Sequence, residues 1–397
     1  MVGAGRHQRR AIDRARELGL RVVAVDRNPD APGLAAADEG EVVDFTDVAA
    51  VTEVGRRREV DGVLTVSADR AVPVVAAVAE ALGLPGIGTS TAHLMTHKVA
   101  MRRLFAERGV PQPAFAALRR MSERHAALEA TGLPAVLKPV DSGGQRGVFR
   151  LESLDDLEAH LHAALAESAT GEAIVEAFHE GLELNGLAVA RGGEVELLTL
   201  SDRLRPPGIG FGVGWTHVYP STLFGDALER AEETAVSAVH ALGLRDGIAF
   251  PQVIVSEDGE CLVIEVAARI PGGQMADLAR HAVGVDLVEV ALRQALGIAV
   301  PDELVKPHFS QPLAIKFLTA SPGPLPTGRV RSVGTLEKVL AFPGVVQAEL
   351  YLQPGETIRP VRLDGDRRGY VIAVADTNLE ALERADAAAS LVDVIVE

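Results

Sequence analysis

The sequence has few of the residues that build disulfides, metal clusters, membrane spans or nucleic-acid surfaces. One cysteine, Cys261, in 397 residues excludes an intramolecular disulfide and a cysteine-based zinc cluster. The net charge of -16 argues against general nucleic-acid binding, which needs clustered basic side chains. No apolar run reaches the roughly 20 residues of a membrane span, and the start MVGAGRHQRR leads into no secretory apolar stretch. We therefore expect no nucleic acid, no membrane and a cytoplasmic location.

The first part of the chain alternates strand-like and helix-like segments. The runs RVVAV (21–25), EVVDF (41–45) and GVLTV (62–66) alternate with HQRRAIDRARELG and AVPVVAAVAEALG, which have helical spacing and end in glycine. This predicts a Rossmann-like parallel sheet over residues 1–88. GAG at 3–5, with Asp26 after the second strand, weakly resembles a dinucleotide-binding turn whose third glycine is missing. Only two residues precede this turn, so we expect a truncated first strand and a natural start upstream.

Four further segments follow in the expected α/β (α+β) fold. Residues 89–111 read as a connecting helix, and 112–175 as a small α+β unit with a glycine-rich loop. Residues 176–310 form a larger α+β unit, and 311–397 a C-terminal α+β portion. RPPGIGFGVG (205–214) is the most loop-like stretch and a candidate cover.

The stretch KPVDSGGQRGV combines a strand lysine with a glycine-rich turn. Its glycine amides can approach an anion closely, and Lys138 and Arg146 add positive charge. An ordinary hairpin turn with two surface cations is an equal alternative. It is not a Walker A loop, because GxxxxGK[ST] does not occur.

Downstream, VEAFHEGLEL places Glu176 and Glu183 around a turn. Backbone groups where a strand leads into this turn could form hydrogen bonds with the edge of an adenine, and a carboxylate could accept hydrogen bonds from ribose hydroxyls. The alternative is that both acids are simply solvated.

The hairpin IAFPQVIVSEDGECLVIEV brings polar residues together. If Val255 pairs with Glu260, Gln252 lies opposite Val263 and diagonal to Glu265. Because successive side chains of a strand point to opposite faces of the sheet, the following residues would then share one face: Gln252, Val263, Glu265, Ala267 and Arg269. Oxygen donors without histidine or cysteine suit a hard cation such as Mg²⁺ or Mn²⁺. An internal Glu265–Arg269 ion pair is the alternative.

The order of these motifs resembles the ATP-grasp superfamily over essentially the whole chain. The residues that carry the resemblance are Lys98 in HKVAMRRLFAERGVPQP, Lys138 with its glycine loop, Glu176, Glu183, Gln252, Glu265 and Arg269. Within the superfamily the chain looks most like carboxylate–amine ligases that join amino acids, such as alanine–anticapsin ligase. The resemblance implies a Rossmann-like domain followed by an ATP-grasp fold of two α+β subdomains.

The resemblance also implies roles for individual residues. Lys98 and Lys138 would contact the ATP phosphates, Glu183 would hold the ribose, and Glu265 would bridge Mg²⁺ ions with Gln252 as a further ligand. The loop over the phosphates would comprise Ser142, Gly143, Gly144, Arg146 and Gly147, and the adenine would be read by backbone groups of Glu176, Ala177, Phe178 and His179. Two departures from the family pattern, Gln252 for glutamate and Ala267 for asparagine, lower the expectation of two occupied metal positions.

The chemistry implied is formation of an amide bond through an acyl phosphate, with catalytic roles for Lys138, Glu265 and Arg269. Gly272 and Gly273, at the start of a helix, could hold a substrate carboxylate. Gln274 and His217 could line the pocket, although ordinary packing or capping explains them as well. The loops 142–147 and 207–214 are candidates for excluding water. The partners would be a small carboxylic acid and an amine, and a homodimer is compatible with the family.

Three alternatives remain open. A related chemistry would phosphorylate bicarbonate or another carboxylate for a different nucleophile. A catalytically degenerate ATP-binding protein would explain Gln252 and Ala267. An NAD-dependent dehydrogenase would use GAG and Asp26, but it leaves the central residues unexplained. The sequence leaves undecided which acid and amine are joined, how many ions bind and how many chains assemble.

Overall fold

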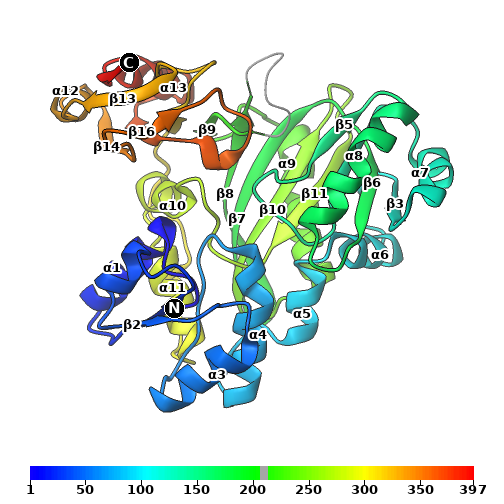
Figure 1. Ribbon diagram of the computed structural model, residues 1–397, viewed down its shortest axis with the longest axis horizontal. Helices are drawn as coiled ribbons and strands as arrows, with labels where there is room; N and C mark the ends of the chain where they lie inside the picture. Colours follow the sequence, from blue (N-terminus) through cyan, green and yellow to red (C-terminus); the bar gives the residue numbers. More distant parts are fainter. Residues whose placement is uncertain (206–212) are drawn as a thin grey trace.

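The computed structural model of the chain describes residues 1–205 and 213–397. Residues 206–212, most of the expected cover at 205–214, lie outside the described residues. Three bodies surround a central sheet in Figure 1, with the N-terminal elements at the lower left and the C-terminal elements at the upper left. Among the described helices, none combines the length and apolar character needed to cross a bilayer.

The N-terminal elements alternate as the sequence predicts. They are α1 (Arg6–Glu17), β1 (Val23–Asp26), α2 (Pro32–Ala36), β2 (Glu39–Val42), α3 (Val48–Arg57) and α4 (Val72–Leu82). Strands β1 and β2 pair in parallel, and α4 ends at Gly83, whose positive φ of 68° makes glycine the favoured residue. The expected strand 62–66 forms only one bridge, from Val66 to Ile270. The backbone there ties the N-terminal body to the segment after β11.

The connecting segment is two helices, α5 (Thr89–Leu94) and α6 (Lys98–Arg108), where the sequence predicted one. The break has a local cause. The side chain of His97 accepts a hydrogen bond from the amide of Ala100 and so caps α6. Lys98 is therefore the first residue of α6, and Gly109 ends the helix in the left-handed conformation.

A four-stranded sheet forms the body at the right of Figure 1, covered by α7 (Arg124–Thr131) and α8 (Leu154–Glu167). Its strands, in hydrogen-bonded order, are β3 (Phe115–Leu118), β6 (Ala173–Ala177), β4 (Ala135–Pro139) and β5 (Phe149–Leu151). Ser153 and Asp156 form a capping box at the start of α8, as the sequence pattern indicates. Leu157 and Leu161 of α8 are buried against this sheet.

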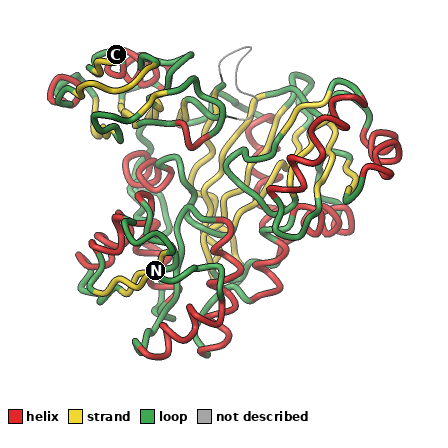
Figure 2. The backbone as a smooth tube through the Cα atoms, in the orientation of Figure 1, coloured by secondary structure: helices red, strands yellow, loops and turns green. Residues whose placement is uncertain are grey.

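The central sheet is antiparallel and has eight strands, and Figure 2 shows its longest strands as yellow segments near the centre of the molecule. In hydrogen-bonded order they are β11 (Cys261–Ala267), β10 (Gly247–Val255), β7 (Leu182–Arg191), β8 (Glu194–Leu204), β9 (Thr216–Tyr219), β12 (Leu313–Phe317), β16 (Gly369–Val374) and β14 (Val345–Leu350). Because β12 pairs with β9, the sheet continues across residue 311, where the sequence suggested a separate portion.

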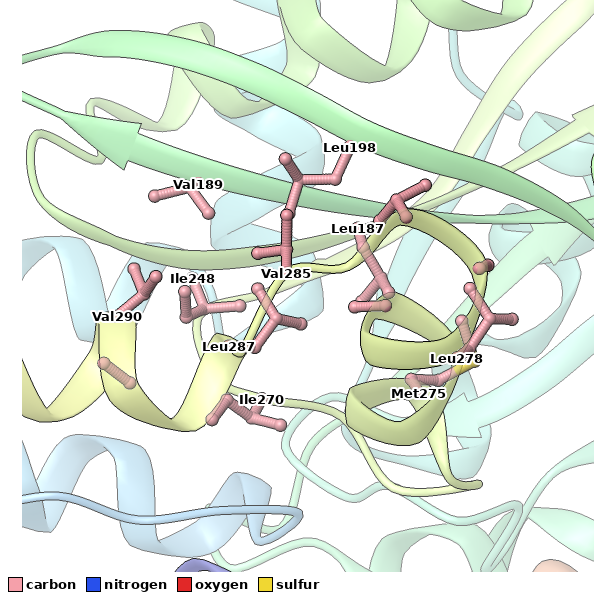
Figure 3. Packing of buried hydrophobic residues seen from close by; sticks show 14 of the residues in the cluster. Leu187, Val189, Leu198, Ile248, Ile270, Met275, Leu278, Val285, Leu287 and Val290 are labelled. Carbon is pink, nitrogen blue, oxygen red and sulfur yellow. The ribbon is translucent and has the colours of Figure 1, made fainter. Parts of the chain in front are cut away.

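Helices cover both faces of the central sheet. Leu187 and Val189 of β7 pack with α10 (Met275–Val283) and α11 (Leu287–Ala295), and Figure 3 shows both strand residues in this cluster. Ala188 and Ala190 alternate to the other face and pack with α9 (Asp226–Leu242). Both faces are therefore apolar over this part of the sheet.

The C-terminal elements complete the fold. They are β13 (Gly328–Val333), α12 (Glu337–Leu340), β15 (Thr357–Ile358), α13 (Asn378–Ala389) and β17 (Val394–Val396), besides β14 and β16 of the central sheet. Strands β15, β13 and β17 form a small antiparallel sheet. Thr377 caps α13, and Ala381 and Ala385 of this helix pack on the central sheet. The fold is thus the expected mixed α/β class.

Candidate active site

Two adjoining cavities lie along β10 and β11. The narrow cavity borders the four-stranded sheet, and the wide cavity borders the N-terminal and C-terminal bodies. The narrow cavity has a volume of about 130 Å³ and the wide cavity one of about 480 Å³. Residues that line both are Gly143, Gly144, Gln145, Arg203, Gln252 and Glu265. The two spaces therefore meet at the glycine-rich loop and at the predicted metal ligands.

Two buried lysines face the narrow cavity from different elements. Lys98 begins α6, and its Nζ donates to the carbonyl oxygen of Ser142 at 2.8 Å and lies 3.1 Å from Oε1 of Glu265. Lys138 lies on β4, and its Nζ is 2.6 Å from Oε2 of Glu176. Burial lowers the pKa of Lys138, and the carboxylate of Glu176 opposes this effect. Lysines held in this way present positive charge to an anion.

Glu176 is the centre of a buried charge cluster. Its carboxylate lies between Lys138 and Arg102, whose Nε is 2.9 Å from Oε1 of Glu176. Burial alone would raise the pKa of Glu176, but the charges of Arg102 and Lys138 outweigh it and lower the pKa to about 2. Arg102 also donates to the carbonyl oxygens of Val263 and Ile264 at 2.7 and 2.6 Å. The cluster therefore fixes α6, β4, β6 and β11 relative to one another.

The exit from β6 lines the narrow cavity, as expected for an adenine-reading segment. Its lining residues there include Glu176, Ala177, Phe178 and His179. Glu183 at the start of β7 also lines it, but its carboxylate is already paired with Arg203 and Arg205, each at 2.6 Å. A ribose at Glu183 would therefore meet an acid held by two guanidinium groups.

Only the first part of the glycine-rich loop lines the two cavities. Ser142, Gly143 and Gly144 line the narrow cavity, and a Cβ atom added to Gly143 would lie 2.3 Å from Oδ2 of Asp69. Arg146 lines neither cavity; its half-exposed side chain lies 3.8 Å from Glu167. Gly147 likewise lines neither. The predicted phosphate loop is therefore confined to its first residues in this structure.

The register predicted for the β10–β11 hairpin is wrong by one residue at the turn and by two residues beyond a β-bulge. Val255 pairs with Cys261, not Glu260, and Gln252 lies directly opposite Glu265, not Val263. The register shifts between Gln252 and Val253, which leaves Ile264 as the extra residue. Val263 consequently packs in the core against α9, while Glu265 lines both cavities.

The ion pair that competed with the metal interpretation is absent, because each partner has found another. Glu265 pairs with Lys98. Arg269 pairs with Asp69, whose Oδ1 lies 2.7 Å from Nε and 2.6 Å from Nη2 of the guanidinium. Nη1 of Arg269 is buried without a hydrogen-bond partner. Asp69 thus orients Arg269 and leaves one of its donors free.

The oxygen donors at the bulge suit one hard cation. Nε2 of Gln252 donates to Oδ1 of Asn185 at 2.9 Å, which leaves Oε1 of Gln252 for another partner. Asn185 in turn contacts Nδ1 of His217 at 3.1 Å. Over the described residues there is no group of three His, Cys, Asp or Glu side chains that could hold a metal ion. One carboxylate and one amide oxygen fit a Mg²⁺ ion whose other ligands are waters and phosphate oxygens.

The wide cavity contains the residues expected on the substrate side. Those brought together there are Arg269, Gly272, Gly273, Gln274 and His217. Nε2 of Gln274 donates to Tyr351 Oη at 2.8 Å. Burial, followed by the charges of Arg367 and Arg203, lowers the pKa of His217 well below its ordinary value. His217 is therefore a neutral side chain beside arginines.

Several residues of the site were missed by sequence reasoning. They are Asp69, Arg102, Asn185, Arg203 and Arg367. Asn185 lies two residues after Glu183, so the same alternation of the strand could have found it. Asp69 and Arg367 come from distant segments of the N-terminal and C-terminal bodies, and no local pattern indicates them.

Comparisons with known proteins match three family models along the chain. The family model for the ATP-grasp N-terminal domain matches residues 12–86, that for the D-ala D-ala ligase C-terminus residues 104–282, and that for L-amino acid ligase C-terminal domain 2 residues 324–397. A formate-dependent phosphoribosylglycinamide formyltransferase of Burkholderia cenocepacia is 30% identical over 99% of this chain and 94% of its own length.

Solved structures share the fold. L-amino acid ligase from Bacillus licheniformis has a TM-score of 0.85 at 22% identity, covering 100% of this chain and 98% of that chain. A biotin carboxylase–β,γ-ATP complex from Campylobacter jejuni has a TM-score of 0.75 at 18% identity, covering 100% of this chain and 92% of that chain. Fold and site define a nucleotide-dependent enzyme. The chain belongs to the ATP-grasp family, among the ligases that form carbon–nitrogen bonds.

Proposed function

We propose that the protein joins a small carboxylic acid, such as an amino acid, to an amine through an acyl phosphate, with ATP converted to ADP and phosphate. One observation carries the proposal: the lysine-lined narrow cavity opens beside Gln252 and Glu265 into a wide cavity with free donor capacity on Arg269. A carboxylate in the wide cavity would therefore lie next to a nucleotide tail in the narrow one.

The first half-reaction creates the electrophile. A carboxylate oxygen attacks the γ-phosphorus, the bond to the β–γ bridging oxygen breaks, and ADP leaves. Lys98 and Lys138 hold phosphate oxygens, and Nη1 of Arg269 donates to the oxygens of the transferring group. Bound Mg²⁺, held by Glu265 and Gln252, would supply charge neutralisation of the phosphates.

The second half-reaction forms the amide bond. The neutral amine attacks the acyl carbon, phosphate leaves with the acyl–oxygen electron pair, and the amine gives up a proton. Water has to be excluded, since it would hydrolyse the acyl phosphate. The narrow cavity of about 130 Å³ lies below the usual ~300 Å³ of a ligand site, so the glycine-rich loop that lines it moves outward to admit a nucleotide and returns over it.

Two features support amino acids as the acid. The model for L-amino acid ligase C-terminal domain 2 matches the part of the chain that contributes Arg367 and Tyr351 to the wide cavity. The wide cavity is lined by positive side chains, among them Arg269 and Arg367, and also by the carboxylates of Asp69 and Asp364. A lining with both signs of charge suits a zwitterion better than a simple anion.

The test is a phosphate-release screen over pairs of amino acids, with mass spectrometry of the products. We expect release that requires an acid, with a product lighter than the two substrates by one water. Glu265→Gln should lose turnover and keep the fold, because it removes a charged ligand from a partly buried position on the cavity wall and keeps the size of the side chain. Full activity of Glu265→Gln, or release that no acid or amine stimulates, would contradict the proposal.

A second candidate is formate activation followed by transfer to phosphoribosylglycinamide. The observation in its favour is the 30% identity to a formyltransferase of that specificity over almost the full chain. The same screen separates the two, since this reaction requires formate and phosphoribosylglycinamide together and ignores amino-acid pairs. Bicarbonate is included as a third acid, and ADP binding without any substrate-dependent release would indicate a degenerate enzyme.

A further inference from the structure

A third cavity borders the segment after β11 that carries Arg269, and we call it the rear cavity. Its volume is about 660 Å³, larger than either cavity of the candidate active site. Its walls come from the N-terminal body, β10 and α11, and include Val63, Val72, Ile248, Ile270, Ala291 and Val300. This size and apolar lining are those of a small-molecule site.

The rear cavity and the wide cavity share one segment of chain. Ala267, Arg269 and Pro271 line the wide cavity, whereas Ala268 and Ile270 line the rear cavity. The backbone bends at Ala268 and Arg269, directly after the end of β11. Arg269 itself lines both spaces, and Figure 3 shows Ile270 near Ile248 and Leu287 in the packed cluster. Anything bound in the rear cavity would press on the backbone that carries Arg269.

The polar groups around the rear cavity define what it can bind. Arg191 at its edge already donates to the carbonyl oxygen of Val300 at 2.8 Å and pairs with Asp302 at 2.7 Å. Asp246 accepts from the amide of Gly192 at 2.9 Å. The charges of Arg191 and Asp246 are satisfied locally, so these two groups create no demand for a charged ligand. Arg269 also lines the rear cavity, and its unpartnered Nη1 is the donor that the proposed reaction assigns to the transferring phosphoryl group.

Gln294 is different. Its Nε2 donates to the carbonyl oxygen of Ala190 at 2.7 Å, but its Oε1 is buried without a hydrogen-bond partner. An unsatisfied buried acceptor is costly, and a ligand that donates to it recovers that cost. Gln294 therefore gives an otherwise apolar cavity one specific polar requirement.

We propose that the rear cavity binds a small, neutral, largely apolar molecule with one N–H or O–H donor, and that this molecule regulates the enzyme through Arg269. The coupling has a physical route. Leu64 and Thr65 line the rear cavity. Two residues further on, the amide of Ser67 donates to the carbonyl oxygen of Ile270 at 2.9 Å, which ties this strand to the segment that carries Arg269. The Asp69–Arg269 pair lies immediately beyond this junction.

Indole and benzofuran test the binding, since they have nearly the same shape and differ in the donor. Calorimetric titration of the full chain should show indole binding about fivefold more tightly, the contribution of one neutral hydrogen bond. Gln294→Leu should abolish this preference while benzofuran still binds. Equal affinity for both probes in the original protein, or no binding of either, would overturn the proposed site.

A cavity-filling variant locates the binding. Ala291→Phe places a ring in the rear cavity and should abolish binding of both probes. Ala130→Phe, at an exposed position of α7, is the matched control and should leave both affinities unchanged. Binding that survives in Ala291→Phe would place the probes elsewhere. These titrations contain no substrates, so they test the site independently of the proposed ligase reaction.

The regulatory part is tested by measuring the affinity of a non-hydrolysable ATP analogue, whose γ-phosphoryl group Arg269 would contact, with and without saturating indole. Because coupling between two sites is reciprocal, we expect the affinity of the analogue to change by about fivefold and indole affinity to change by the same factor when the analogue is present. The change should disappear in Ala291→Phe. An affinity of the analogue that indole leaves unaltered would show that the rear cavity does not act on Arg269.

Discussion

Replacing Glu176 by glutamine should destabilise the protein strongly and in a pH-dependent way. The carboxylate is buried between Lys138 and Arg102, and its pKa in the folded protein is about 2 against an ordinary value of 4.5. Each pKa unit corresponds to about 1.4 kcal/mol, so the ionised carboxylate contributes about 3 kcal/mol at pH 7. Breaking a buried ion pair from one side independently leads to a loss of about 3–5 kcal/mol.

The sign of the pH dependence follows from proton linkage. The folded pKa is depressed, so the stabilisation is fully present above pH 4.5 and declines as the pH falls through the interval from 4.5 to about 2. At pH 3 the contribution should have shrunk to about 1 kcal/mol. Urea denaturation of the original protein and of Glu176→Gln at both pH values measures this difference directly.

A matched substitution separates burial from the loss of a carboxylate as such. Glu180→Gln changes an exposed glutamate four residues further along the chain and should alter the free energy of unfolding by less than about 0.5 kcal/mol. A loss below about 1 kcal/mol for Glu176→Gln at pH 7, or a loss that is the same at pH 3, would refute the reasoning from the charge cluster.

Three further predictions concern the active site. Asp69→Asn should lower kcat by about tenfold to hundredfold with little change in the KM for ATP, because Arg269 loses its orienting partner; unchanged steady-state kinetics would contradict this. Gly143→Ala should lower turnover because the new Cβ would meet Asp69, and an added Asp69→Ser should restore the loop position; a purely additive double-mutant cycle would disprove the contact. His217, whose pKa burial and then Arg367 and Arg203 lower, should remain neutral in imidazole NMR spectra down to pH 6. The unfolded chain would bind the proton instead, so this group lowers stability as the pH falls below about 6.5.

Local patterns predicted much of the fold because their causes are local. Gly83 and Gly109 end helices where the sequence places them, and Ser153 begins α8 with a capping box. The two lysines and Glu265 also line one cavity, as the resemblance implies. The expected strand at 62–66 is different, since its pairing depends on which backbone lies beside it. In the structure, Val66 of this segment forms a single bridge to Ile270 instead of a continuous ladder with a neighbouring strand.

The hairpin shows why register was harder to predict than element type. Alternating apolar residues indicated both strands, but a single bulge at Ile264 shifts the facing of every later residue. Without the bulge, Glu265 would share the face of Val263, which packs against α9 in the core. An unpaired carboxylate there would be costly. The bulge is therefore what allows one strand to supply both core residues and a cleft ligand.

The pairing of Arg269 with Asp69 makes the N-terminal body part of the candidate active site. Arg269 belongs to the segment after β11, whereas Asp69 begins the short helix Asp69–Ala71 and follows the junction of Val66 with Ile270. Since Nε and one N–H of Nη2 are taken by Asp69, Nη1 is the nitrogen without a partner that can donate to a substrate. A rigid shift of the N-terminal body would thus redirect that donor even if the central sheet stayed in place. The orientation of the reacting group is set at the contact between two bodies.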